Sequence, residues 1–250
     1  RRRQVQKYEM PVGNGSRAYL PAISPQIRQL ISRRYGVDIP LFGSFWDWLE
    51  AHPKIPIVPT EGGKKALALL SQGFVPLAFY RVNGGYQKLL DETRRLIPDV
   101  ARFAANDRRF VLAFDQDQKA ATKRRVFVAL YRFGGLLRQA GCSVGVATWK
   151  ATQGKGVDDL IVQGGATLWE RAYTQAPPLQ HWMIWQRLEN RLTYLASVKV
   201  TTTDLSTLVL DDIPNSGIVA IESAKGTGET GNLEPGVLPY RGRRWITRLF

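Results

Sequence analysis

The chain has 250 residues, of which 44% are hydrophobic and 10% are aromatic. This composition supports a packed core and excludes an intrinsically disordered chain. Lys and Arg number 35 against 21 Asp and Glu, giving a formal net charge of +14, which favours a polyanionic partner such as nucleic acid.

Cysteine and histidine usage narrows the class of protein further. The single Cys142 excludes an internal disulfide, and His52 and His181 are too far apart in sequence to indicate a zinc site. No apolar run approaches the roughly 20 residues that span a bilayer, and the start of the chain lacks the apolar core of a signal peptide. We therefore expect a cytoplasmic protein without a membrane partner. Because the chain begins with three arginines and no Met, we expect a trimmed gene product or a fragment.

Residues 1–54 predict an N-terminal extension that packs on the following domain. Pro, Gly and Asn at irregular spacing make residues 1–24 rich in loops, with a short strand over 18–20. A helix is predicted over 25–36 and a second over 45–53, ending at Gly36 and Pro53 respectively.

Residues 55–180 alternate short apolar runs with longer amphipathic ones, which is typical of βα units and a parallel sheet. The predicted strands are 55–60, 75–81, 108–114 and 143–149. The predicted helices are 64–72, 85–97, 119–140 and a last one near 167–175. The fold class is therefore α/β.

Residues 181–216 predict a helical and linker segment. The helix covers about 179–195 and places Trp182, Trp185, Leu188 and Leu192 on one face. Tryptophans that share leucine spacing indicate packing in a core or interface rather than stacking on bases. A linker is expected around 203–216.

Acidic side chains follow three of the predicted strands. They are Glu61, then Asp115 and Asp117, then Asp158 and Asp159 across a loop. Since the carboxyl ends of parallel strands share one edge of a sheet, these carboxylates can converge on a hard cation such as Mg²⁺. The lysines interleaved with them predict phosphate contacts; they are Lys64, Lys65, Lys119 and Lys155. The alternative for each acid is a stabilising charge in the first turn of a helix.

The motifs resemble the Toprim domain of primases and topoisomerases, in which a Glu-Gly pair precedes an Asp-x-Asp pair. More closely, the chain is similar to the Toprim-related domain-of-unknown-function 3854 family of cyanobacterial plasmid replication proteins. The matching stretches are KYEMPVGNGSRAYLP, FWDWLEAHPKIPIVPTEGGKKALALLSQG, VLAFDQD and KGVDDLIVQGG. The resemblance implies acid–base work for Glu61 and Mg²⁺ ligation by Asp115 and Asp117, while Asp158 and Asp159 match the family's Lys-Gly-x-Asp-Asp signature.

In these replication proteins a helicase-type ATPase domain follows and begins with a phosphate loop ending Gly-Lys-Thr. The stretch SAKGTGET resembles that loop in Lys225, Gly226, Gly228 and Thr230, but Glu229 stands where the loop has its lysine. A carboxylate there opposes the β and γ phosphates, so we expect ATP binding to be badly weakened and do not predict ATP hydrolysis. Residues 217–250 are expected to be a truncated start of such a domain, and a simple Gly-rich turn after a strand explains the stretch equally well.

These observations favour a DNA-replication protein with a Mg²⁺-dependent, primase-like phosphoryl-transfer domain that works with a helicase partner or a missing helicase domain. A nuclease of the same type, a catalytically silent nucleic-acid-binding module and a small-nucleotide phosphohydrolase stay open.

Overall fold

The structure is a computed structural model that describes residues 15–105, 107–197, 237–240 and 243–246. Contacts divide the chain into two compact units, Arg1–Met183 and Ile184–Phe250. The first unit carries every predicted site residue outside the phosphate-loop stretch. None of the helices in the described part of the chain combines the length and apolarity needed to cross a membrane.

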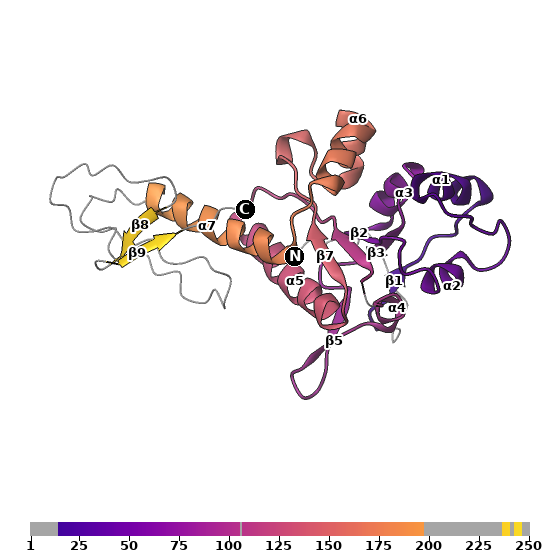
Figure 1. Cartoon of the computed structure of the whole chain (residues 1–250), viewed down its shortest axis with the longest axis horizontal. Coiled ribbons are helices and arrows are strands. Elements are labelled where there is room, and N and C mark those ends of the chain that lie inside the picture. Colours follow the sequence, from indigo (N-terminus) through magenta and orange to yellow (C-terminus); the bar gives the residue numbers. More distant parts are fainter. Residues whose placement is uncertain (1–14, 106, 198–236, 241–242, 247–250) are drawn as a thin grey trace, which may run out of the picture. The chain divides into compact units, whose positions relative to one another are not determined.

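The first unit is a mixed α/β fold built on a parallel sheet, as the alternating pattern predicts (Figure 1). Its parallel strands are β2 (Val58–Glu61), β3 (Pro76–Phe79), β6 (Arg109–Leu112) and β7 (Ser143–Val146). The short β1 (Ala18–Tyr19) pairs antiparallel with β3 at the edge. Parallel bridges between β2 and β6 join the two halves, so the strand order is β1-β3-β2-β6-β7.

Pro59 explains why β2 and β6 are joined by separate bridges rather than by a continuous ladder. Ile57 donates to the carbonyl of Arg109 at 2.9 Å, and its own carbonyl accepts from Val111 at 2.9 Å. The next donor in this alternation would be residue 59, but proline has no N–H. Pairing resumes where the carbonyl of Pro59 accepts from Ala113 at 2.9 Å.

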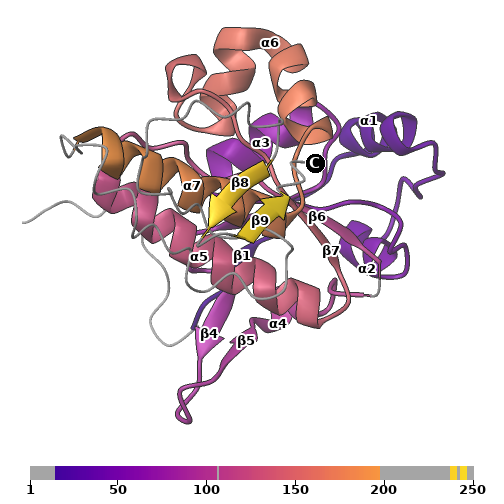
Figure 2. The ribbon, with the colours of Figure 1, turned by 60° about the vertical axis from the view of Figure 1, so that its left-hand side comes forward.

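Helices cover both faces of the sheet (Figure 2). Val58 and Val111 pack on one face in a cluster that includes Trp169 of α6 (Val157–Thr174) and Leu69 of α3 (Gly63–Ser71). The residues beside them in sequence point the other way, because side chains alternate along a strand. That second face packs against α5 (Ala120–Gln139), among others.

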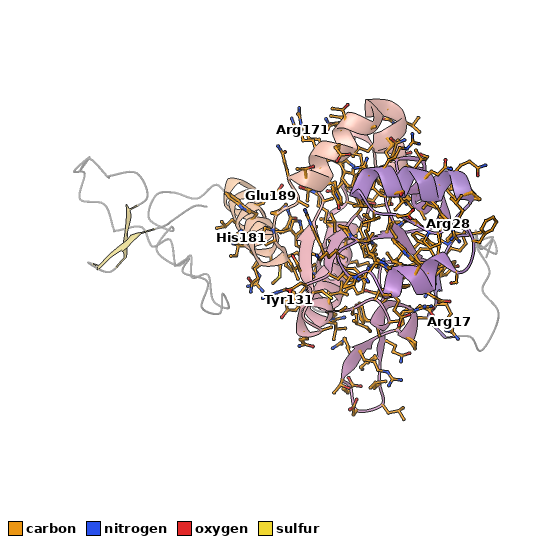
Figure 3. The ribbon with its side chains drawn as sticks, turned by 45° about the vertical axis from the view of Figure 1, so that its right-hand side comes forward. Arg17, Arg28, Tyr131, Arg171, His181 and Glu189 are labelled. Carbon is orange, nitrogen blue, oxygen red and sulfur yellow. The ribbon has the colours of Figure 1, made fainter. Side chains whose placement is uncertain are left out.

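The N-terminal helices α1 (Pro25–Tyr35) and α2 (Phe45–Glu50) belong to the same hydrophobic core. Two buried arginines hold this region through backbone carbonyls. Arg108, which is 0% exposed, donates to the carbonyls of Leu49, Glu50 and Ile55. Arg28 of α1, labelled in Figure 3, donates to the carbonyls of Ile23, Pro40, Phe42 and Gly43.

The helix predicted over 85–97 is wrong, because this segment is a β-hairpin that projects from the body of the unit (Figure 2). Its strands are β4 (Tyr86–Lys88) and β5 (Arg94–Leu96), followed by the short α4 (Pro98–Ala101). The turn is fixed by Asp91, whose carboxylate accepts from the backbone N–H and the hydroxyl of Thr93, and by Glu92 at a φ of 67°. The exposed Leu90 lies in this turn.

The helix predicted near 167–175 begins earlier in the structure. After a 3-10 turn, η1 (Ala151–Gln153), α6 starts at Val157 rather than near 167, and it kinks at Gly165. The predicted helix over 179–195 is confirmed as α7 (Leu179–Ser197); Trp182 is buried, whereas Trp185 is half exposed. The second unit contains the rest of α7 and an antiparallel hairpin of β8 (Val237–Tyr240) and β9 (Arg243–Ile246).

Candidate functional site

The candidate site lies at the point in the sheet where the order of the strands changes direction. From β2 the chain moves to β3 on one side, and later returns to place β6 on the other side of β2. In open α/β sheets, ligands bind outside the carboxyl ends of strands at such a switch point. Glu61 ends β2, and Asp115 follows β6, so the two predicted acids lie at this point.

Lys65, from the first turns of α3, ties the two strand ends together. Its Nζ lies 2.9 Å from Oδ1 of Asp115, and the side chains are only 18% and 19% exposed. Burial lowers the pKa of Lys65, but the hydrogen bond and charge of Asp115, together with the charges of Asp158 and Glu61, outweigh it and raise the pKa. Lys65 is therefore held as an ammonium ion among carboxylates.

Glu61 is a carboxyl group whose surroundings favour the protonated form. Burial raises its pKa above the ordinary value, and the negative charge of Asp115 raises it further. Lys65 and Lys155 act in the opposite direction without cancelling these effects. A carboxyl group with a raised pKa at a strand end is a candidate for proton transfer.

The loop before α6 closes the other side of the site. Gln116 donates its N–H to the carbonyl of Lys155 at 2.8 Å. The Nζ of Lys155 lies 3.4 Å from Oδ2 of Asp117 and 4.0 Å from Oδ2 of Asp115, while its side chain is 59% exposed. The predicted Asp-x-Asp and Lys-Gly-x-Asp-Asp stretches are thus brought together.

Gly156 makes room for Lys65 in this loop. A Cβ at residue 156 would lie 2.3 Å from Cε of Lys65 and 2.4 Å from Oδ1 of Asp158, closer than real contacts allow. The sequence motif contains this glycine, but only the structure shows that its missing side chain is what lets Lys65 pass between α3 and α6.

The two acids of α6 have different surroundings. Asp159 is the third residue of α6, and its Oδ2 accepts from the N–H of Gly156 at 3.2 Å, which is a capping bond. Oδ1 of Asp158 is buried without a hydrogen-bond partner among the described residues. A buried carboxylate oxygen without a donor is uncommon in folded proteins and indicates a place for a cation or a donor group.

The outer residues of the predicted set lie around this centre. Oδ1 of Asp117 accepts from the N–H of Lys119 at 2.9 Å, and this bond, with the charges of Lys155 and Lys119, lowers the pKa of Asp117. Lys119 precedes α5, and Lys64 precedes Lys65 in α3; both are exposed. Glu61, Lys65, Asp115, Asp158 and Lys155 are therefore the inner residues.

The segment that carries the site matches a known protein family. Residues 45–168 match the family model described as "Domain of unknown function (DUF3854)". This segment of the chain is therefore a DUF3854 domain. All nine inner and outer residues of the site lie within the matched range; they are Glu61, Lys64, Lys65, Asp115, Asp117, Lys119, Lys155, Asp158 and Asp159.

A curated relative of this chain is an uncharacterized protein of Picosynechococcus sp. (strain ATCC 27264 / PCC 7002 / PR-6). It is 35% identical over 235 residues, which cover 90% of this chain and 23% of that protein. The chain thus spans about a quarter of the length of the relative it matches.

A solved structure, the Aquifex aeolicus primase with its zinc-binding and RNA polymerase domains, has a TM-score of 0.39 and 17% identity. That match covers 64% of this chain and 37% of the primase, and it is too distant to bear on function.

The acids of the DUF3854 site fit a divalent cation only in part. No group of three or more His, Cys, Asp or Glu side chains is arranged to hold a metal ion among the residues the structure describes. Asp115 and Asp158 nevertheless offer hard oxygen ligands, and each has an Oδ1 that is buried without a well-formed hydrogen bond, although that of Asp115 is ion-paired with Lys65. Magnesium is commonly held by one or two carboxylates, with water and phosphate oxygens completing the shell. Asp115 and Asp158 supply the carboxylates of such a site, and water and phosphate would have to supply the other ligands.

The degenerate phosphate loop lies outside the described residues. This holds for Lys225, Gly226, Gly228, Glu229 and Thr230. Farther along the chain, the structure describes β9, which pairs antiparallel with β8.

Proposed function

We propose that the DUF3854 segment is a Toprim-like domain that binds nucleic acid and transfers phosphoryl groups with Mg²⁺, in a DNA-replication protein of plasmid or mobile-element type. The observation that carries this proposal is the meeting of Glu61, Lys65 and Asp115 at the carboxyl ends of the two central parallel strands. Two lysines and several carboxylates at a switch point suit a phosphodiester and a divalent ion better than a neutral ligand.

The residues have separate roles in this proposal. Lys65 and Lys155 bind phosphate oxygens as point charges, and Asp115 orients Lys65. Glu61 accepts or returns the proton of the attacking or leaving hydroxyl, for which its raised pKa is suited. Asp115 and Asp158 would hold Mg²⁺, which when bound stabilises charge on the phosphoryl oxygens.

A second candidate is a nucleic-acid-binding module without chemistry. It is favoured by the ion pairs that already neutralise Asp115 and Asp117 through Lys65 and Lys155. The chain's charge of +14 serves this function equally well. In this alternative the acids position the lysines and no metal is needed.

The two candidates are separated by one experiment. The full chain is incubated with labelled single-stranded and duplex DNA, with or without Mg²⁺ and nucleotides, beside an Asp115→Asn variant whose fold is checked by circular dichroism. Extension or cleavage that needs Mg²⁺ and disappears in the variant supports the enzyme, and the product tells a primase from a nuclease. Salt-sensitive binding without product, in both proteins, supports the binding module.

The remaining parts of this proposal concern partners of the chain. A helicase, encoded separately or in a longer chain, is the proposed partner, because the stretch around Glu229 keeps the glycines of a phosphate loop but not its lysine. We propose that this chain does not hydrolyse ATP. A Glu229→Lys variant that gains no nucleotide affinity would remove the phosphate-loop interpretation.

A further inference from the structure

The centre of the site is already occupied by a cation that belongs to the protein. The Nζ of Lys65 is 2.9 Å from Asp115, and the charges of Asp158 and Glu61 act on the same ammonium group. A divalent ion held between Asp115 and Asp158 would lie beside this ammonium group, which already contacts Oδ1 of Asp115. Two cations that close together repel each other strongly.

The position of Lys65 is built into the fold. Its side chain is 18% exposed and crosses Gly156, where the Cε atom occupies the space of a missing Cβ. It leaves α3 only four residues after Glu61, so the helix start fixes it relative to the strand end. Lys155, in contrast, is 59% exposed and lies farther from Asp115, at 4.0 Å.

From this geometry we propose that Lys65 is a resident cation that competes with the divalent metal, and that a bound phosphate draws it away. Without nucleic acid, Lys65 neutralises Asp115 and keeps the site metal-poor. A phosphate group of the bound nucleic acid provides Lys65 with another anionic partner, and this frees Asp115 for the metal. Metal and nucleic acid then strengthen each other's binding, and by linkage the effect is reciprocal. The inference rests on the proposed function for the identity of the phosphate ligand, but not for the competition itself.

The competition is tested by metal binding rather than by activity. Mn²⁺ binding to the full chain is measured by electron paramagnetic resonance, for the natural sequence and for Lys65→Met, which keeps most of the length of the side chain but removes its charge. We expect Lys65→Met to bind Mn²⁺ about ten- to a hundredfold more tightly, as the loss of one positive charge at contact distance implies. Lys88→Met, the control, removes the same charge from an exposed position in the β4–β5 hairpin and should change the affinity less than about threefold.

Two further variants locate the effect. Lys65→Arg keeps the charge and should retain the weak Mn²⁺ affinity of the natural chain. Adding Asp115→Asn to Lys65→Met should remove the gain, because the freed ligand is lost. If Lys65→Met does not fold by circular dichroism, Lys65→Gln carries the same expectation.

The coupling is tested by adding a short oligothymidylate to the same measurement. The natural chain should bind Mn²⁺ more tightly with the oligonucleotide, whereas Lys65→Met, already tight, should gain little. Equal Mn²⁺ affinities for Lys65→Met and the natural chain would overturn the inference. A chain that shows the predicted Mn²⁺ effects but makes no product from DNA would leave the inference standing and remove the proposed enzyme.

Discussion

Lys65 and Asp115 form an ion pair that links the start of α3 to the end of the neighbouring strand β6, with 2.9 Å between Nζ and Oδ1. Each side chain is about four-fifths buried, so neither charge is well solvated when its partner is missing. Removing one member of such a pair costs more than the pair itself contributes, because the other charge stays in place.

This relationship predicts a loss of stability for Asp115→Asn. We expect the free energy of unfolding to fall by about 2 kcal/mol, below the figure for a fully buried pair because water reaches part of the site. Urea denaturation measures the change. The exposed pair of Lys88 and Glu92 is the control, and Lys88→Met should change stability by less than about 0.5 kcal/mol. Similar losses in the free energy of unfolding of the two variants would show that the Lys65–Asp115 pair stabilises the fold no more than an exposed pair does.

The pKa of Glu61 predicts a pH-dependent stability. Because its pKa in the folded chain is raised above the ordinary 4.5, the folded state binds the proton more strongly, and stability is lost as pH rises through the folded pKa. Glu61→Gln removes this loss, so it should melt at a higher temperature than the natural chain at about pH 7. Below the ordinary pKa of Glu61 the two melting temperatures should converge. Equal melting temperatures of Glu61→Gln and the natural chain at both pH values would contradict this prediction.

Gly156→Ala should disturb the site more than the fold. The added Cβ would overlap Lys65 Cε and Asp158 Oδ1, and relieving such overlaps costs about 1–3 kcal/mol. We expect DNA binding to weaken as Lys65 is displaced. The control is Gly135→Ala in α5, where nothing lies within 4 Å of the new atom, and stability should rise by about 0.5–1 kcal/mol. Binding and melting curves for both variants test this, and normal DNA binding by Gly156→Ala would contradict it.

Arg108 should be essential for attaching α2 to the sheet. Burial lowers its pKa to about 10, and its guanidinium donates to the carbonyls of Leu49, Glu50 and Ile55. Arg108→Met leaves these carbonyls without their donor, and we expect a loss of about 3 kcal/mol in the free energy of unfolding. Hydrogen exchange should show faster exchange in 45–50 than in β6. A loss below about 1 kcal/mol would indicate that water replaces the guanidinium.

The exposed Lys155 should contribute to nucleic-acid affinity mainly through salt-dependent contacts. If it meets one phosphate, Lys155→Met should reduce the slope of log affinity against log salt by about one. Fluorescence anisotropy at several salt concentrations measures this slope. An unchanged slope, with Lys88→Met as the matched surface control, would place Lys155 outside the nucleic-acid interface.

The sequence predicted the parallel strands and their helices well, since buried strands such as 109–112 are short apolar runs bounded by polar residues. It failed at 85–97, where a turn that Asp91 and Thr93 fix locally makes a hairpin instead of a helix. It also missed the true start of α6 at Val157, which lies before the kink at Gly165, and found only the part of the helix beyond that kink.

The site was predictable as a set of residues but not as an arrangement. Strand ends indicated that Glu61 and Asp115 would meet, since neighbouring parallel strands end at one edge. Which lysine pairs with which acid depends on side-chain paths, and the passage of Lys65 over Gly156 leaves no trace in spacing or composition. Likewise, capping by Asp159 and the orphaned oxygen of Asp158 distinguish two adjacent, chemically identical residues.

The core described above includes Ile31 of α1 and Trp182 of α7, which lie on either side of the matched range 45–168. The range that matches the family model is therefore shorter than the part of the chain that shares one hydrophobic core. A protein trimmed to the matched range would expose the apolar surface that these flanking helices cover, and it should aggregate rather than report on the site. The variants proposed here belong in chains that keep α1 and the start of α7, and the same margin applies when relatives are cut out of longer proteins.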